Sequence, residues 1–183
     1  YGSSVANVLR RLLRIARHYG SDPRFLFSSA TIREPAEHAR RLAGRDVVVV
    51  DEDGSPAGEK IFGVYAPPIV DPVAGLRANA LEETRRLAPA VCGPEHQTIF
   101  FCIRRTSVEV LTRYLKEAAN SMGLKPDEIR GYRGGYLPNL RREIESGLKD
   151  GSVKVVVSTN ALELGIDLGR LDVAVLVGYP GSQ

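Results

Sequence analysis

The residues most able to do chemistry follow a run of valines. Residues 153–157 (Val-Lys-Val-Val-Val) predict a strand buried on both faces, as in a parallel sheet. Three polar residues come directly after it, where a strand ends and a helix can begin: Ser158, Thr159 and Asn160. Their side chains, with the free N–H groups of a helix start, suit a phosphate. Gly165 allows close backbone approach and Asp167 adds a carboxylate, so the run predicts a phosphate-binding loop.

Three other segments also place polar or glycine residues after an expected strand. Ser29-Ala30-Thr31 follows residues 24–28, Arg104-Arg105-Thr106 follows residues 98–102, and Tyr132-Arg133-Gly134-Gly135 follows residues 129–131. Ligands of doubly wound sheets bind at the carboxyl ends of strands, so these segments are candidate sites of the same kind. Local interpretations compete with this one: a helix N-cap at Thr31, a surface loop with a cap after residue 102, and a plain glycine turn after residue 132.

The elements that must position these residues alternate along the chain. Strands are expected at 24–28, 46–50, 98–102, 129–132, 153–157 and 171–178, and helices at 4–19, 35–44, 76–87, 107–121 and from 138 onward. Thr106 and Glu109 have the spacing of a capping box for the helix at 107–121. Strands that alternate with helices predict right-handed crossovers and a three-layer α/β fold with a parallel sheet.

A proline-rich segment at 66–72 indicates a stiff linker between two parts of this fold. We therefore expect a first domain at 1–66, a linker at 67–74 and a second domain at 75–183. The only methionine is Met122, which indicates a piece of a longer protein.

Composition limits the class of protein. The 183 residues are 43% hydrophobic and 26% charged, which is typical of a globular domain, and no apolar run approaches the ~20 residues of a membrane span. Cys92 and Cys102 lack metal-site spacing, so a reduced, cytoplasmic setting and no metal site are expected. A net charge of +3 gives no global signature of nucleic-acid binding, and the arginines on the helix at 4–19 are interpreted as a solvated face.

Taken in order, these segments resemble superfamily 2 helicases of the DEAD/DEAH-box type over nearly the whole chain. Two sequence motifs are similar to those of bacterial mitomycin-repair helicases and RecQ-four-like DNA helicases: residues 132–138 (Tyr-Arg-Gly-Gly-Tyr-Leu-Pro) and 159–167 (Thr-Asn-Ala-Leu-Glu-Leu-Gly-Ile-Asp). The resemblance implies two RecA-like domains, of which this chain holds the end of the first and most of the second.

The resemblance also implies roles for the candidate residues. Ser29, Ala30 and Thr31 match motif III, which couples the nucleotide state to the other domain. Residues matching motifs IV and V and the intervening loop would bind nucleic acid: Arg104, Arg105, Thr106, Arg133, Gly134, Ser158, Thr159 and Asn160. Gly165 and Asp167 would face the nucleotide cleft, with a ribose hydroxyl or an arginine as the partner of Asp167.

Other parts of such a motor are missing from the sequence. No Gly-x-x-x-x-Gly-Lys-Ser/Thr run occurs, so the chain holds no complete catalytic set. The resemblance places acidic motif II before Tyr1 and motif VI after Gln183. The run Val47-Val48-Val49-Val50-Asp51-Glu52 looks like a magnesium-binding Walker B strand, but it follows the Ser-Ala-Thr motif instead of preceding it, so a turn is favoured.

The expected parent protein is therefore a cytoplasmic ATP-dependent DNA helicase or translocase, acting in DNA repair with ATP and Mg²⁺ and tracking along one strand. The isolated chain is expected to be inactive, and its oligomeric state is not indicated. Three alternatives stay open at this stage: a duplex translocase or remodeller, an RNA helicase, and a non-catalytic α/β interaction module.

Overall fold

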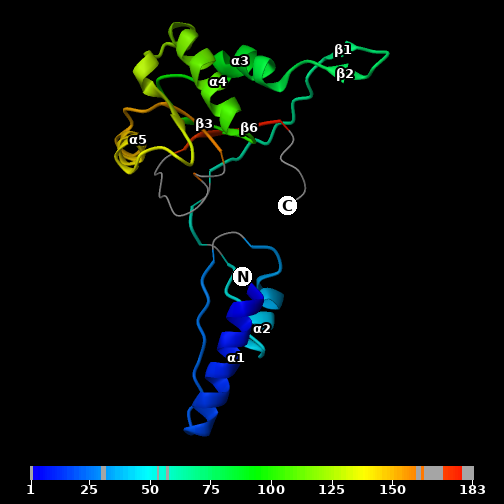
Figure 1. Cartoon of the computed structure of the whole chain (residues 1–183), viewed down its shortest axis with the longest axis vertical. Helices are drawn as coiled ribbons and strands as arrows, with labels where there is room; N and C mark the ends of the chain where they lie inside the picture. The colour runs from blue at the N-terminus through cyan, green and yellow to red at the C-terminus, as the bar shows by residue number, and fades with distance from the viewer. Residues whose placement is uncertain are drawn as a thin grey trace. The chain divides into compact units, whose positions relative to one another are not determined.

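The structure is a computed structural model that describes residues 2–29, 32–52, 54–56, 58–159, 162 and 171–178. It consists of two compact units, residues 1–62 and 63–183 (Figure 1). The domain boundaries expected from the sequence, at residues 66 and 75, stay a prediction. No described helix combines the length and the apolar character needed to cross a membrane.

The first unit is built on two packed helices, α1 (Gly2–His18) and α2 (Pro35–Ala43). Ala6 and Leu13 of α1 and Ala43 of α2 are buried. Proline at the first position of α2 suits a helix start, and Gly44 ends the helix in the left-handed region at φ 69°, with its N–H donating to the carbonyl of Arg40. Both predicted helices are confirmed.

The two strands predicted in the first unit are wrong. Residues 24–28 and 46–50 carry no strand pairing, and Leu26 and Val48 are 99% and 94% exposed. A strand is stable only when its backbone groups pair with a neighbour, and no described segment of this unit pairs with either. Asp51 and Glu52 are exposed after the unpaired valines.

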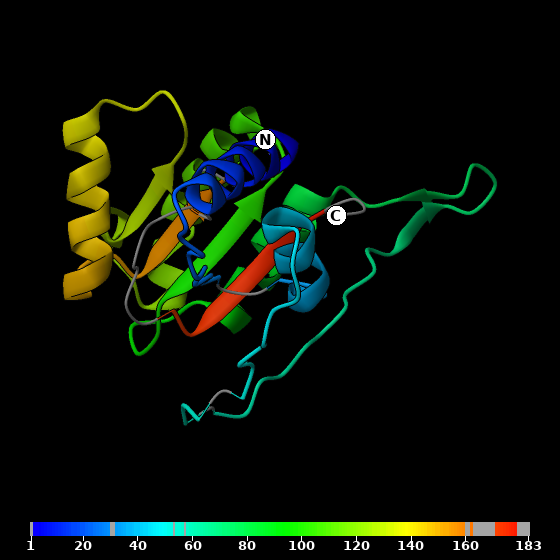
Figure 2. The ribbon, with the colours of Figure 1, turned by 90° about the horizontal axis from the view of Figure 1, so that it is seen from below.

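The second unit contains a four-stranded parallel sheet in the order β4-β5-β3-β6. Its strands are β3 (Thr98–Cys102), β4 (Ile129–Tyr132), β5 (Val155–Ser158) and β6 (Val173–Val177). Figure 2 shows β3 between β5 (orange) and β6 (red). All four strands were predicted, β3 and β4 with the bounds observed and β5 and β6 with ends shifted by one or two residues.

Helices cover both faces of this sheet. On one face, α3 (Ala80–Val91) and α4 (Arg105–Glu117) pack on Phe100, Val155 and Val157; on the other, α5 (Pro138–Asp150) packs on Ile99 and Val156. Alternate residues of β3 and β5 thus serve opposite cores, as the period of a strand requires. Two short 3₁₀ helices, η1 (Ala119–Met122) and η2 (Pro126–Glu128), lead from α4 to β4. The expected three-layer α/β fold is confirmed.

The start of α3 differs from the expectation of a helix at 76–87. Leu76–Arg77 forms β2, which pairs antiparallel with β1 (Ile69–Asp71), so these residues are not available to a helix. Asn79 then caps α3, its Oδ1 accepting from the N–H of Leu81 at 2.8 Å. The segment expected to be a stiff linker, residues 67–74, therefore contains β1 and part of the turn of a small hairpin, whose second strand is Leu76–Arg77.

Candidate nucleic-acid interface

The carboxyl ends of three strands lie at one edge of the sheet. Because the strands are parallel, register decides which residues share a level, and Ser158 of β5 is paired with both Phe101 of β3 and Tyr132 of β4. The chain therefore leaves β3, β4 and β5 at nearly the same height. Within a few residues of these points lie Arg104, Arg105, Arg133 and Thr159.

Helix α4 begins at this edge. Arg104 is its N-cap, with extended backbone and no side-chain capping bond, and its carbonyl accepts from the N–H groups of Ser107 and Val108 at 3.1 and 3.3 Å. Arg104, Arg105 and Thr106 are exposed. The start of a helix is electropositive, so two guanidinium groups and the helix dipole act on the same region.

The predicted capping box at Thr106 and Glu109 is wrong. Thr106 lies inside the first turn of α4 and not at its N-cap. The carboxylate of Glu109 instead accepts hydrogen bonds from the loop that follows β4. The helix start is therefore left without side-chain caps.

The loop after β4 approaches the start of α4 closely. A Cβ placed on Gly134 would lie 3.8 Å from Nη2 of Arg105, so these two predicted site residues are neighbours. Gly135 adopts a φ of 99°, which a residue with a side chain rarely does, and this allows the loop to turn back. The structure thus brings together the segments predicted after β3 and β4.

Arg133 is held within this loop by two neighbours. Its Nε donates to Oε1 of Glu109 at 2.6 Å, and its guanidinium carbon lies 4.9 Å from the ring centroid of Tyr136. The hydroxyl of Tyr136 donates to the same Oε1 at 3.1 Å. The hydrogen bond to Glu109 raises the pKa of Arg133. Burial is the main cause that raises the pKa of Tyr136, and the charge of Glu109 raises it further.

The two residues after the valine strand are less accessible. Ser158 is fully buried, with Oγ donating to the carbonyl of Thr159 at 2.7 Å, and Thr159 is 8% exposed. Among the described residues that follow β3, β4 and β5, the exposed ones accordingly belong to the loops after β3 and β4. The roles of Ser158 and Thr159 in nucleic-acid binding stay predictions.

Several predicted site residues lie outside the described residues: Ala30, Thr31, Asn160, Gly165 and Asp167. Ser29 is described and exposed in the first unit. The motif III and nucleotide-cleft assignments therefore also stay predictions.

Glu109 is the residue of this site whose contact the sequence reasoning missed. It lies 24 residues from Arg133 and 27 from Tyr136, so only the packing of α4 against the β4 loop brings them together. Guanidinium groups beside an uncapped helix start can bind an anion with several oxygens, and a phosphodiester is such an anion.

Comparison with known proteins gives a consistent result. Residues 82–183 match the family described as the helicase conserved C-terminal domain. The chain is 50% identical over 183 residues to the uncharacterized ATP-dependent helicase YprA of Bacillus subtilis, covering all of this chain and 24% of that protein. It is 37% identical over 188 residues to the ATP-dependent helicase HRQ1 of Saccharomyces cerevisiae, covering all of this chain and 18% of that protein.

Solved structures show the same relationship. The DUF1998 helicase MrfA bound to DNA and AMPPNP matches 99% of this chain and 25% of that chain, with a TM-score of 0.84 and 49% identity. The Mycobacterium smegmatis helicase Lhr bound to ssDNA and AMP-PNP matches 81% of this chain and 19% of that chain, with a TM-score of 0.54 and 31% identity. The chain thus spans about a quarter or less of the length of these proteins.

Proposed function

Because the chain belongs to the superfamily 2 helicases through their conserved C-terminal domain, we propose that its second unit binds the sugar–phosphate backbone of one DNA strand within an ATP-dependent helicase motor. The activity of the whole protein, its role in DNA repair and its place in the cytoplasm belong to this proposal. So does movement along a single tracking strand.

The observation that carries the proposal is the convergence of three strand ends on one edge. The register of β3, β4 and β5 brings the ends of these strands level, with Arg104 and Arg105 following β3 and Arg133 following β4, and Gly134 lies beside Nη2 of Arg105. Contacts made by guanidinium groups and helix N–H groups to phosphate oxygens carry no base information, so binding would be insensitive to sequence. MrfA has been solved bound to DNA and Lhr bound to ssDNA, and this supports a nucleic-acid ligand for a helicase that contains this chain.

ATP with Mg²⁺ is the proposed energy source of the whole protein. This chain lacks the Gly-x-x-x-x-Gly-Lys-Ser/Thr sequence that binds the β- and γ-phosphates of a nucleoside triphosphate. The proposed contribution of this chain to the nucleotide cleft is limited to Gly165 and Asp167. Ser29, Ala30 and Thr31 would couple that cleft to the DNA-binding edge.

Substitution of Arg105 tests the DNA contact. We expect Arg105→Ala to weaken binding of the 183-residue chain to a fluorescent oligo-dT by about tenfold, the usual value of a charge-assisted hydrogen bond. The slope of log K against log salt should fall by about 0.7, the value for one phosphate contact on single strands. Titration by fluorescence anisotropy between low and moderate salt measures both quantities.

Arg113→Ala is the matched control, because Arg113 lies near the far end of the same helix in an exposed pair with Glu117. It should leave the slope unchanged. Equal slopes for the wild type and Arg105→Ala would contradict the proposed site. The same titration with duplex DNA and with oligo-U distinguishes a duplex translocase and an RNA helicase from the proposed function.

A further inference from the structure

We propose that Glu109 is a positioning residue of this site: it holds Arg133 and Tyr136 in the arrangement in which Arg133 receives a backbone phosphate. The inference rests on the proposed function and adds a residue that makes no contact with the ligand itself. It is carried by the way one carboxylate oxygen joins two elements.

That oxygen is Oε1 of Glu109, on the second turn of α4. It accepts from Nε of Arg133 at 2.6 Å and from the hydroxyl of Tyr136 at 3.1 Å, both in the loop after β4. The loop is thus attached to the helix at two points three residues apart. Two donors on one acceptor fix the path of the loop more firmly than either would alone.

Arg133 is constrained at its edge and on its face. Its Nε edge meets Glu109, and one face lies over the ring of Tyr136 with 4.9 Å between the guanidinium carbon and the ring centroid. The two Nη groups form the outer end of the side chain, and Nη1 donates a long hydrogen bond of 3.4 Å to the carbonyl of Gly134. This outer end can meet two oxygens of a phosphate together.

Strand β4 has the shape that this arrangement needs. A Cβ on Gly131 would lie 3.2 Å from the hydroxyl of Tyr136 and 2.9 Å from Oγ1 of Thr112. The absence of a side chain at Gly131 therefore lets the tyrosine hydroxyl pass close to the strand on its way to Glu109. Helix, loop and strand all take part in holding Arg133.

Stability alone does not account for the arrangement. The side chains of Arg133 and Glu109 are 30% and 50% exposed, and an ion pair this exposed adds little to the free energy of folding. Ordering a long side chain before the ligand arrives removes part of the entropic cost of binding. The carboxylate also repels phosphate, and we expect the ordering of Arg133 to outweigh this repulsion.

Four variants test the positioning role of Glu109 in binding of the 183-residue chain to oligo-dT: Glu109→Ala, Glu109→Gln, Arg133→Ala and the double variant Glu109→Ala/Arg133→Ala. Glu109→Ala should weaken binding about three- to tenfold, the usual cost of ordering one long side chain. Glu109→Gln should keep most of the affinity, because its amide oxygen can still accept from Nε and the tyrosine hydroxyl. The double variant Glu109→Ala/Arg133→Ala should bind no more weakly than Arg133→Ala, because Glu109 acts through Arg133.

Glu117→Ala, an exposed carboxylate on the same helix, is the matched control and should bind like the wild type. If Arg133→Ala weakens binding while Glu109→Ala binds as well as the wild type or better, the positioning role is overturned and the proposed function stands. A double variant clearly weaker than Arg133→Ala overturns it too. If Arg133→Ala binds oligo-dT as tightly as the wild type, both the proposed phosphate contact of Arg133 and the positioning role of Glu109 are overturned.

Discussion

At the scale of single residues, the two thiols of the chain show how burial controls reactivity. Cys92 and Cys102 are both buried, and desolvation raises the pKa of each to about 11. The reactive species is the thiolate, so at pH 8 its fraction is about a hundredfold or more below that of a free cysteine. Both residues belong to the core under α3 and α4.

We therefore expect the thiols of the native chain to react with Ellman's reagent about two orders of magnitude more slowly than free cysteine does. In denaturant, two thiols per chain should react at the rate of the free amino acid. Stopped-flow absorbance at pH 8 measures both rates. Fast modification of one thiol without denaturant would mean that the core around it opens more readily than its burial indicates.

Glu109 shows where sequence reasoning stops at this scale. Its spacing from Thr106 satisfies the local rule for a capping box, yet its carboxylate contacts a loop 24 residues away. The capping-box rule covers only residues within one helical turn, whereas the partners of Glu109 lie in the loop after β4. By contrast, Arg104, Arg105, Arg133 and Gly134 could be placed together, because parallel strands end at one edge.

At the scale of elements, the packing of α5 on the start of β5 depends on one glycine. A Cβ on Gly147 would lie 2.6 Å from Cγ2 of Val153 and 3.1 Å from Oγ of Ser152. Val153 is buried, and its N–H donates to the carbonyl of Gly147 at 2.9 Å. The helix and the strand entry are therefore too close to admit a methyl group.

Gly147→Ala should lower the free energy of unfolding by about 1–3 kcal/mol, the usual cost of overpacking, despite the better helix propensity of alanine. Val153→Ala in the same chain removes the clashing methyl groups, so the double variant should be more stable than the sum of the two single effects predicts. Urea unfolding followed by circular dichroism measures all three. Strict additivity would show that the helix shifts away from Val153 at little cost.

Elements with a local signal were predictable, and elements that depend on a partner were not. The valine-rich β5 and the proline start of α5 are both present as expected. Residues 24–28 and 46–50 have similar patterns but no strand to pair with, so the pattern alone was insufficient. The helix expected from residue 76 failed for the opposite reason, because Leu76–Arg77 pairs with β1 across a turn in which Asp71 accepts from two backbone N–H groups.

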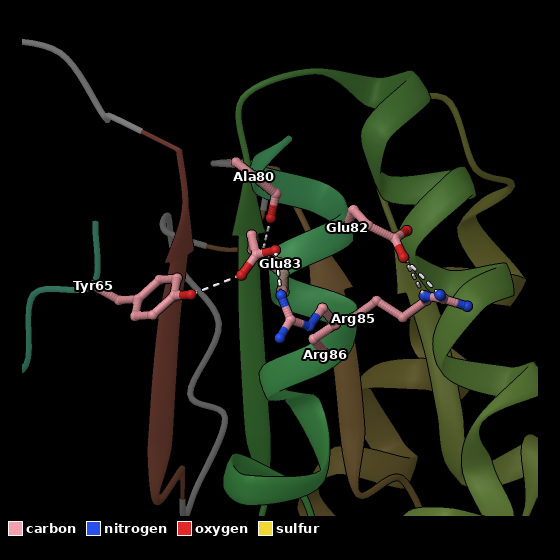
Figure 3. A network of polar contacts seen from close by, with 7 residues as sticks. Tyr65, Ala80, Glu82, Glu83, Arg85 and Arg86 are labelled. Carbon is pink, nitrogen blue, oxygen red and sulfur yellow. Dashed lines mark hydrogen bonds and ion pairs between the residues drawn. The ribbon is translucent and has the colours of Figure 1, made fainter. Parts of the chain in front are cut away.

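At the scale of the whole molecule, the segment that enters the second unit is attached to that unit from Tyr65 onward. The hydroxyl of Tyr65 donates to Oε2 of Glu83 at 2.7 Å, and Nη1 of Arg86 donates to Oε1 at 2.9 Å (Figure 3). Further along, Arg77 and the N–H of Ala78 donate to the carbonyls of Pro67 and Pro68 at 2.6 and 2.8 Å. We therefore expect the segment that enters the second unit to be flexible before Tyr65 and not within residues 67–74.

Glu83 is the centre of this attachment, and its protonation should control it. The side chain is only 5% exposed, and the hydrogen bonds from Tyr65 and Arg86 hold its pKa below the ordinary value of 4.5. A lowered pKa in the folded state means that Glu83 stabilises the fold fully above about pH 4.5 and loses this effect as the pH falls through the lowered value. Glu83→Gln should therefore lower the thermal midpoint by a few degrees at pH 7 and by progressively less towards pH 3.

Tyr65→Phe removes one of the two donors, so at pH 7 it should expose residues 63–68 to limited proteolysis while the sheet stays folded. Glu82→Gln is the matched control, because Glu82 adjoins Glu83 on α3 but forms an exposed pair with Arg85. Differential scanning fluorimetry against pH, with mass spectrometry of the early proteolytic fragments, measures both effects. If Glu83→Gln and Glu82→Gln followed the same pH profile, the burial of Glu83 would have no role in holding the connecting segment, and the pivot between the two units would have to extend into residues 65–79.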